Sequence, residues 1–105
     1  MRVISQKRLR EFWQRCRDAE GPLRSWYKIA LTADWASIQQ VRKTFPQADA
    51  VRLKGGLVVT VFNIGGNKYR LIARVIYEYR RIYVKRVLTH VEYDQNKWKE
   101  QLCGE

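Results

Sequence analysis

The chain has 105 residues and a formal net charge of +11 at pH 7, from 21 Lys and Arg residues against 10 Asp and Glu residues. This length suits one hydrophobic core, so we expect a single domain over residues 1–105, and no apolar run approaches the roughly 20 residues of a membrane span. The first residues lack the apolar core of a signal peptide, so we expect a cytoplasmic protein, and its positive charge predicts a polyanionic partner such as nucleic acid or an acidic protein.

Two helices are predicted near the start of the chain. Residues 2–4 suit an edge strand, and Ser5 is a candidate N-cap for the helix that follows. That helix is expected to end by residues 20–21, because Pro22 suits the first turn of a second helix. Both helices have apolar residues at helical spacing, first Leu9, Phe12, Trp13 and Cys16, then Leu23, Trp26, Tyr27, Ala30 and Leu31.

A third, shorter helix and an additional strand are predicted before the main sheet. Ser37 and Gln40 have the spacing of a capping box, and Pro46 stops the helix that they begin. Val51 and Leu53 then alternate as in a strand, and residues 54–56 form a turn sequence.

The rest of the chain is organised around residues 57–94. Three β-branched and aromatic runs are separated there by turn sequences at residues 65–67 and 79–81, which predicts a three-stranded antiparallel meander. A short helix is expected over residues 92–102. Helices first and strands afterwards indicate an α+β fold, in which the N-terminal helices pack on one face of a small, mainly antiparallel twisted β-sheet and leave the other face open.

Most of the positive charge falls on the predicted sheet. Between Ala50 and His90, nine basic residues face one acidic residue, Glu78, so this region carries +8 of the formal +11. The nine are Arg52, Lys54, Lys68, Arg70, Arg74, Arg80, Arg81, Lys85 and Arg86. A basic sheet with interleaved aromatic residues suits contact with nucleic acid.

Metal and cofactor chemistry has few candidate residues. His90 is the single histidine, and Cys16 and Cys103 lie far apart without a C-x-x-C motif. These residues do not suit a zinc site or a disulfide framework, and we expect Cys16 to be a buried thiol. No carboxylate cluster suggests a two-metal nuclease, and no Walker A motif occurs. We therefore expect neither metal nor cofactor.

The end of the last predicted strand carries the residue types that metal-independent RNA cleavage needs. That reaction requires a base for the 2′-hydroxyl proton, an acid for the departing 5′-oxygen and fixed positive charge at the phosphate. His90 suits the base or the acid, and Tyr93 or Lys85 suits the second proton transfer. Phosphate contacts are available from Arg70, Arg74, Lys85, Arg86, Lys68 and Lys54, and stacking on bases from Tyr77, Tyr79 and Tyr83.

The same residues are compatible with a role without catalysis. A lone histidine at a strand end is more often structural than catalytic, and alternating arginines are commonly the solvated face of a sheet. Tyrosines on strands commonly pack against cross-strand neighbours. Two alternatives therefore stay open: a non-catalytic RNA- or ribosome-binding module, and a basic domain that binds an acidic protein.

Five segments of the chain match a known family in order. They are Ala33-Asp34-Trp35, Phe45-Pro46-Gln47-Ala48, residues 61–71, Ile82-Tyr83-Val84-Lys85 and Thr89-His90-x-Glu92-Tyr93-Asp94. Together they resemble the HigB-type toxins of the RelE superfamily, from the third helix onward and more loosely before it. The resemblance implies a RelE-like fold and the toxin of a type II toxin–antitoxin pair.

The resemblance further implies a ribosome-dependent endoribonuclease, an mRNA interferase that works through the 2′-hydroxyl without a metal. It implies a HigA-like antitoxin with a helix-turn-helix domain, through which alone the pair contacts operator DNA. Glu92 and Asp94 match the family with a structural role in capping the last turn. By position the resemblance assigns catalysis to Arg70, Lys85, His90 and Tyr93, and charge and position add substrate contacts at Arg74, Arg86, Lys68, Lys54 and Tyr83.

Overall fold

The structure of the protein is a computed structural model that describes residues 1–103. Its elements are β1 (Arg2–Ile4), α1 (Gln6–Arg15), the 3-10 helix η1 (Arg17–Ala19), α2 (Glu20–Thr32), α3 (Ile38–Thr44), β2 (Asp49–Arg52), β3 (Val58–Ile64), β4 (Tyr69–Ile76), β5 (Arg81–Thr89), α4 (His90–Asp94) and α5 (Lys97–Cys103). Helices precede the long strands, so the α+β class predicted from the sequence is confirmed.

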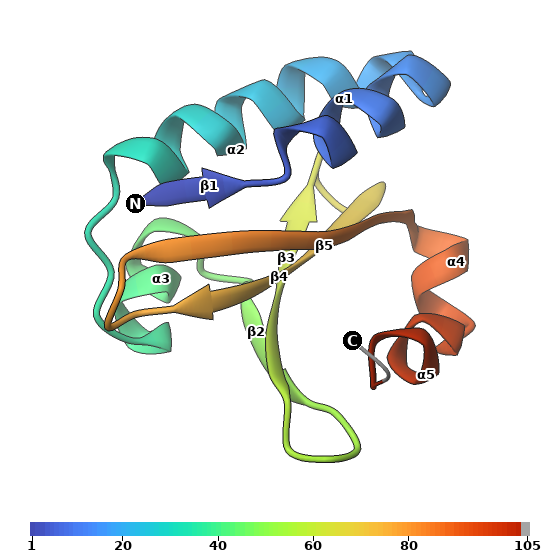
Figure 1. Ribbon diagram of the computed structural model, residues 1–105. Coiled ribbons are helices and arrows are strands. Elements are labelled where there is room, and N and C mark those ends of the chain that lie inside the picture. Colours follow the sequence, from blue (N-terminus) through green and yellow to red (C-terminus); the bar gives the residue numbers. More distant parts are fainter. Residues whose placement is uncertain (104–105) are drawn as a thin grey trace.

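The strands form one sheet in the order β1-β5-β4-β3-β2 (Figure 1). β3, β4 and β5 pair antiparallel as the predicted meander, and β2 extends it as the expected additional strand. β1 pairs parallel with the first part of β5, which makes the sheet mainly antiparallel, as predicted. β4 therefore lies at the centre of the sheet, and β5 beside it leads directly into α4.

The boundary between the first two helices agrees with the prediction, whereas the start of the first helix does not. α1 ends at Arg15, and η1 and α2 follow almost without a break, so Pro22 lies in the first turn of α2. Ser5 precedes α1 with a φ of 79°, and its side chain makes no capping hydrogen bond. The prediction that Ser5 caps α1 was wrong because a capping side chain requires extended backbone, whereas here the chain turns through the left-handed region after β1.

The third helix begins with a capping arrangement close to the predicted one. Ser37 Oγ accepts a hydrogen bond from the Gln40 N–H at 3.4 Å, and Gln40 Oε1 accepts one from the Ala36 N–H at 2.7 Å. The second bond therefore reaches one residue further back than in a standard capping box. α3 ends at Thr44, just ahead of Pro46, as expected.

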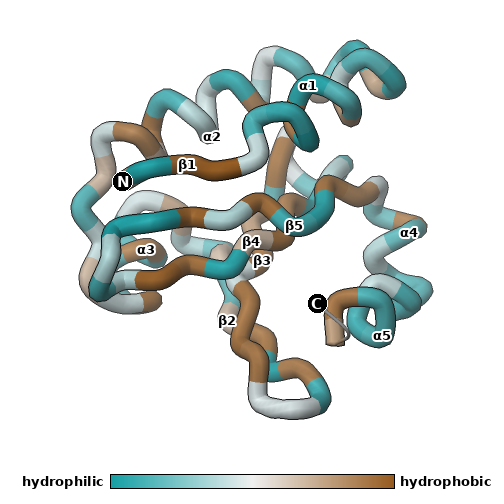
Figure 2. Tube along the Cα trace, viewed as in Figure 1, coloured by the Kyte–Doolittle hydropathy of each residue, from teal (hydrophilic) through white to brown (hydrophobic). Residues whose placement is uncertain are grey.

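The N-terminal helices cover one face of the sheet, as predicted. Trp26 of α2 packs edge-on against Phe62 of β3, with ring centroids 5.3 Å apart, and Phe45 contacts the same ring at 5.4 Å. The alternating colours of α1 and α2 in Figure 2 reflect their amphipathic character. Cys16 is a half-buried free thiol at the margin of this core, less buried than expected.

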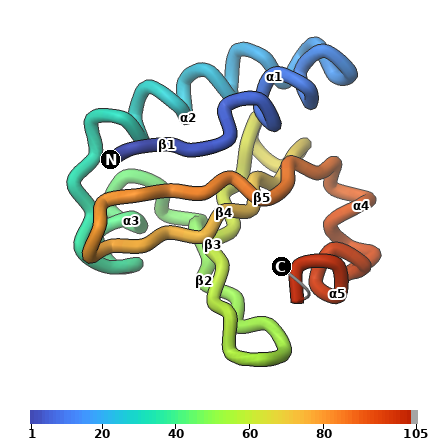
Figure 3. The backbone as a smooth tube through the Cα atoms, in the orientation of Figure 1, coloured from blue at the N-terminus to red at the C-terminus, as the bar shows by residue number. Residues whose placement is uncertain are grey.

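The second face of the sheet is partly covered, so the prediction of an open face was wrong. Trp98 and Leu102 of α5 are buried against Val59, Val61 and Ile72 in a second apolar cluster. The C-terminal helices lie beside the sheet on the side away from α1 and α2, as Figure 3 shows. The two apolar residues of α5 form one stripe of the helix, which accounts for its attachment to this face.

Candidate active site

The junction between β5 and α4 contains the predicted catalytic histidine. Thr89 Oγ1 accepts a hydrogen bond from the Glu92 N–H at 3.2 Å, and Glu92 Oε1 accepts one from the Thr89 N–H at 2.9 Å, a capping box that starts α4 without a loop. The capping role expected for Glu92 is thus confirmed. The His90 N–H donates to the Lys68 carbonyl at 3.0 Å, which ties α4 to the β3–β4 turn.

The His90 imidazole is accessible and has a carboxylate partner. About half of its side chain is exposed (48%), and Nδ1 lies 2.8 Å from Asp94 Oδ2, one helical turn further along the chain. This contact favours a proton on Nδ1 and leaves Nε2 to exchange a proton with a substrate. Asp94 was expected to help cap the last turn, but the structure pairs it with His90, as the i,i+4 spacing on a helix permits.

Tyr93 lies between an aromatic ring and a guanidinium group. Its ring stacks on Trp98 with centroids 5.3 Å apart and an interplanar angle of 17°, and Arg70 Cζ lies 5.5 Å from the Tyr93 centroid. Burial raises the pKa of the Tyr93 hydroxyl, Asp49 and Asp94 raise it further, and Arg70 opposes them. The phenol is therefore protonated at neutral pH, as a proton donor must be.

Arg70 is a predicted site residue that contacts the Tyr93 ring. It lies on β4, and its Nη1 donates to the carbonyls of Asn67 and Tyr69 at 3.1 and 3.2 Å. The guanidinium is thus held by the β3–β4 turn while its face covers the Tyr93 ring. We call Arg70, His90, Tyr93 and Asp94 the junction cluster.

A second group of predicted residues lies further along the β4–β5 hairpin. Arg74 is directly opposite Tyr83, and a register irregularity pairs Arg86 with Ile72 and Val84 with Ala73, with Lys85 as the additional residue between them. Five residues of extended strand, roughly 16 Å, separate Lys85 from His90. Lys85 is therefore set back along β5 from the start of α4, and its part in catalysis stays a prediction.

Arg86 and the remaining lysines also lie outside the junction cluster. Arg86 lines a hollow at the edge of β5 together with residues of α1, and its Nη1 donates to the Lys85 carbonyl at 2.7 Å. Lys68 Nζ lies 3.3 Å from Asp18 Oδ2 on the helical side of the sheet. Lys54 belongs to the β2–β3 hairpin beside α5, where its carbonyl is 3.3 Å from Cys103 Sγ.

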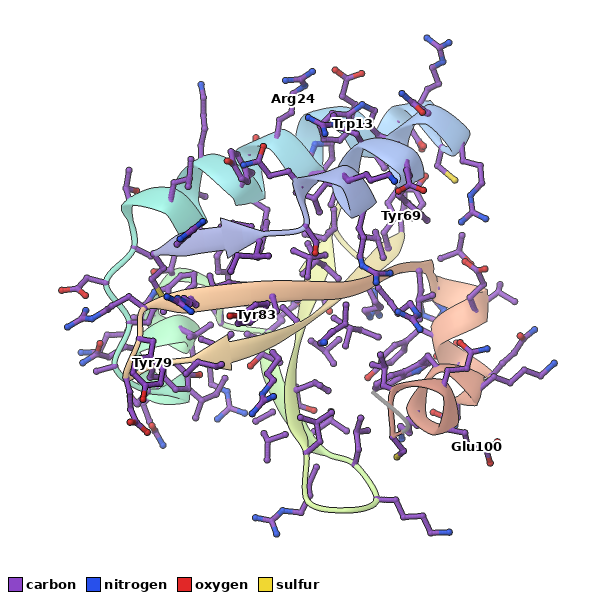
Figure 4. The ribbon with its side chains drawn as sticks, in the orientation of Figure 1. Trp13, Arg24, Tyr69, Tyr79, Tyr83 and Glu100 are labelled. Atoms are coloured by element: carbon purple, nitrogen blue, oxygen red, sulfur yellow. The ribbon has the colours of Figure 1, made fainter. Side chains whose placement is uncertain are left out.

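The candidate stacking tyrosines are spread along the sheet. Tyr79 lies in the β4–β5 turn, at the opposite end of that hairpin from α4, while Tyr83 lies in the first part of β5 (Figure 4). Tyr77 is half-buried against the N-terminal core. Of these three tyrosines, Tyr83 is the one on β5, the strand that leads into α4 and His90.

The described part of the chain, residues 1–103, shows no group of three or more His, Cys, Asp or Glu side chains that could hold a metal ion. Across the same residues, none of the helices has the length and apolar character needed to cross a membrane. The chemistry available at the junction cluster is proton transfer by an imidazole and a phenol beside a fixed guanidinium group.

Helices packed on a mainly antiparallel sheet, with His90 and Tyr93 on the short helix after the last strand, define an α+β protein with a candidate site at that junction. A comparison with family models gives the particular family. The model of the HigB toxin, the RelE-like toxic component of a toxin-antitoxin system, matches residues 19–96. The chain belongs to the HigB toxin family.

Curated relatives align over nearly the whole chain. The mRNA interferase HigB of Escherichia coli O6:H1 is 27% identical over 95 residues, which cover 90% of each chain. The mRNA interferase toxin HigB of Escherichia coli K12 is 28% identical over 94 residues, 90% of this chain and 88% of that protein. The mRNA interferase HigB of Shigella flexneri gives the same values.

Proposed function

We propose that this HigB-family toxin is an endoribonuclease that cleaves mRNA at the junction cluster. The family supplies the toxin role, and the relatives at 27% and 28% identity are named mRNA interferases. The structural observation that carries the proposal is the exposed His90 imidazole, which contacts Asp94 on the same short helix as Tyr93, whose ring lies under the Arg70 guanidinium.

The cleavage step uses groups of the protein and the RNA's own 2′-hydroxyl, independently of a metal. His90 Nε2 takes the 2′-hydroxyl proton, the 2′-oxygen bonds to phosphorus, and the bond from phosphorus to the 5′-oxygen breaks. Tyr93 donates its proton to the departing 5′-oxygen, and Arg70 stabilises the negative charge on the phosphate oxygens. Asp94 stabilises the imidazolium that forms. The products are a 2′,3′-cyclic phosphate and a 5′-hydroxyl.

The substrate is mRNA held on the ribosome. The junction cluster lies on an exposed surface, since about half of the His90 side chain is accessible. Such a surface orients a flexible strand poorly by itself, and the ribosome would supply the missing orientation. Arg74, Tyr83 and Lys85 along the hairpin are proposed to contact the substrate, Lys85 as a phosphate contact because of its distance from His90.

The partner is a cognate antitoxin. Membership in the HigB toxin family calls for a protein that neutralises this chain. We propose a HigA-like antitoxin with a helix-turn-helix domain, which alone contacts the operator DNA. Such a pair works in the cytoplasm, where its mRNA substrate is translated.

The chemistry of the cleaved ends tests this proposal. The mRNA cut by the purified protein in a reconstituted translation system should carry 5′-hydroxyl ends that polynucleotide kinase labels without prior phosphatase treatment. Tyr93→Phe should slow cleavage on the order of 100-fold, because general acid catalysis contributes 10²–10⁴. Tyr27→Phe on α2 serves as the matched control and should cleave at the wild-type rate. Ends carrying 5′-phosphates, or equal rates for both variants, would contradict the mechanism.

A further inference from the structure

Asp18 of η1 contacts two consecutive residues at the start of β4. The Tyr69 hydroxyl donates a hydrogen bond to Asp18 Oδ1, and Lys68 Nζ lies 3.3 Å from Asp18 Oδ2. Asp18 is 50 and 51 positions from these residues in the sequence. A single carboxylate therefore joins the helical layer to the turn between β3 and β4. It precedes residues 19–96, which the family model matches.

The two residues that Asp18 contacts also hold the junction cluster. The Lys68 carbonyl accepts the His90 N–H at 3.0 Å, and the Tyr69 carbonyl accepts Arg70 Nη1 at 3.2 Å. Tyr69 is also paired in register with Thr89, the residue that caps α4. Any shift of the start of β4 therefore moves both the histidine and the arginine.

Packing leaves the Tyr69 hydroxyl directed at η1. Its ring is buried, 8% exposed, and lies edge-on to Phe12 of α1 with centroids 5.3 Å apart. Figure 4 shows Tyr69 beneath the α1 end of the helical layer. The hydrogen bond to Asp18 raises the pKa of the Tyr69 hydroxyl to about 12 and, with Lys68, lowers the pKa of Asp18.

We propose that Asp18 is a positioning residue for the junction cluster, acting through Tyr69 and Lys68 on Arg70 and His90. This inference rests on the proposed function for its catalytic consequence, but not for its structural one. The Lys68 contact is an exposed ion pair, with side chains 67% and 56% accessible, and such pairs contribute little. The Tyr69 hydrogen bond therefore carries most of the effect.

Kinetics of four variants test the inference. Asp18→Ala and Tyr69→Phe should each lower kcat about tenfold with KM within about twofold, because small misplacements of reacting groups reduce rates steeply. Asp18→Asn keeps an oxygen acceptor for the Tyr69 hydroxyl and should stay within about threefold of wild type. The double variant Asp18→Ala/Tyr69→Phe should be no slower than either single variant, because both substitutions remove the same hydrogen bond.

The matched control is Asp34→Asn. Asp34 forms a carboxylate–guanidinium pair with Arg80 at the opposite end of the β4–β5 hairpin from His90. The substitution therefore removes a carboxylate contact far from the junction cluster. Its kcat should equal that of the wild type. Circular dichroism and the urea midpoint identify any variant that fails to fold. If Asp18→Ala fails to fold, the more conservative Asp18→Asn replaces it.

Amide hydrogen exchange separates this inference from the proposed function. The His90 N–H bonds to the Lys68 carbonyl, so Asp18→Ala and Tyr69→Phe should speed its exchange at least tenfold, while Asp34→Asn leaves it unchanged. If the wild type cleaves no RNA, the proposed function fails, and exchange still decides the structural role of Asp18. Wild-type exchange at His90 in folded Asp18→Ala and Tyr69→Phe would overturn the inference, as would wild-type kcat in both variants of an active enzyme.

Discussion

His90 depends on contacts from both its side chain and its main chain. Asp94 holds Nδ1 at 2.8 Å, and the Lys68 carbonyl holds the backbone N–H at 3.0 Å. The side-chain contact determines which imidazole nitrogen faces the substrate. The main-chain contact fixes the position of the His90 backbone, from which the ring extends. The carboxylate and the turn therefore contribute separately to one proton transfer.

Removing the carboxylate should impair the chemistry and spare the fold. Asp94→Asn can present its amide N–H to Nδ1, which favours the opposite tautomer, so kcat should fall on the order of 10- to 100-fold. Single-turnover cleavage measures this loss, and Glu100→Gln on α5 is the control with unchanged rate. An Asp94→Asn variant with wild-type kcat would show that Asp94 does not orient His90.

Ionisation of the Tyr69 hydroxyl should lower the stability of the protein in alkaline solution. Its pKa is raised to about 12 in the folded protein, above the ordinary 10, so the folded state keeps a proton that the unfolded state loses. The stabilisation is complete below about pH 10 and is lost as the pH rises toward 12. The free energy of unfolding, measured by urea denaturation from pH 9 to 11.5, should fall less steeply for Tyr69→Phe than for the wild type. Parallel slopes would contradict this.

Sequence reasoning found much of the junction cluster but not its connections. Arg70, His90 and Tyr93 stand in motifs that resemble the family, and in the structure His90 and Tyr93 share α4 while the Arg70 guanidinium lies over the Tyr93 ring. The pairing of His90 with Asp94 was missed, although four-residue spacing on a helix could have indicated it. The stack of Tyr93 on Trp98 depends on the turn between α4 and α5, which no local pattern specifies.

Short helices position this site, and their stability depends on the contacts at their ends. α4 has five residues, too few to be stable alone, so the Thr89 capping box and the contact with the β3–β4 turn hold it in place. The sequence predicted one short helix over residues 92–102, whereas the structure has two, α4 and α5, separated at Asn96 with a φ of 62°.

Loss of the α4 cap should be measurable in both stability and exchange. Thr89→Ala removes the acceptor of the Glu92 N–H and should lower the free energy of unfolding by about 1 kcal/mol. Thr89→Ser keeps the hydroxyl and should lose much less. Urea denaturation gives the free energies, and the exchange rate of the Glu92 amide reports the cap itself. Equal exchange in both variants would show that the hydroxyl does not protect this amide.

Across the whole molecule, the sheet is covered unequally on its two faces. The helical layer buries one face with aromatic packing around Phe62, and α5 attaches to the other through Trp98 and Leu102. The sequence predicted the first layer because its apolar periodicity is long. It missed the second because two apolar residues in a short polar segment do not distinguish a docked helix from a frayed end.

The attachment of α5 should contribute substantially to stability. Leu102 is fully buried, so Leu102→Ala should lower the free energy of unfolding by about 2–4 kcal/mol through lost burial and the cavity left behind. The adjacent exposed Cys103 gives the control. Cys103→Ala should change the free energy of unfolding by less than about 0.5 kcal/mol. Equal urea midpoints for the two variants would show that α5 is not docked on the sheet.

We have proposed that His90 takes part in the cleavage of mRNA on the ribosome. Primer extension on a defined mRNA, incubated with purified wild type or His90→Ala with and without a reconstituted translation system, tests it most directly. We predict discrete new 5′ ends with the wild type during translation only, and none with His90→Ala. New ends that persist in His90→Ala, or none with the wild type in either reaction, would contradict the account.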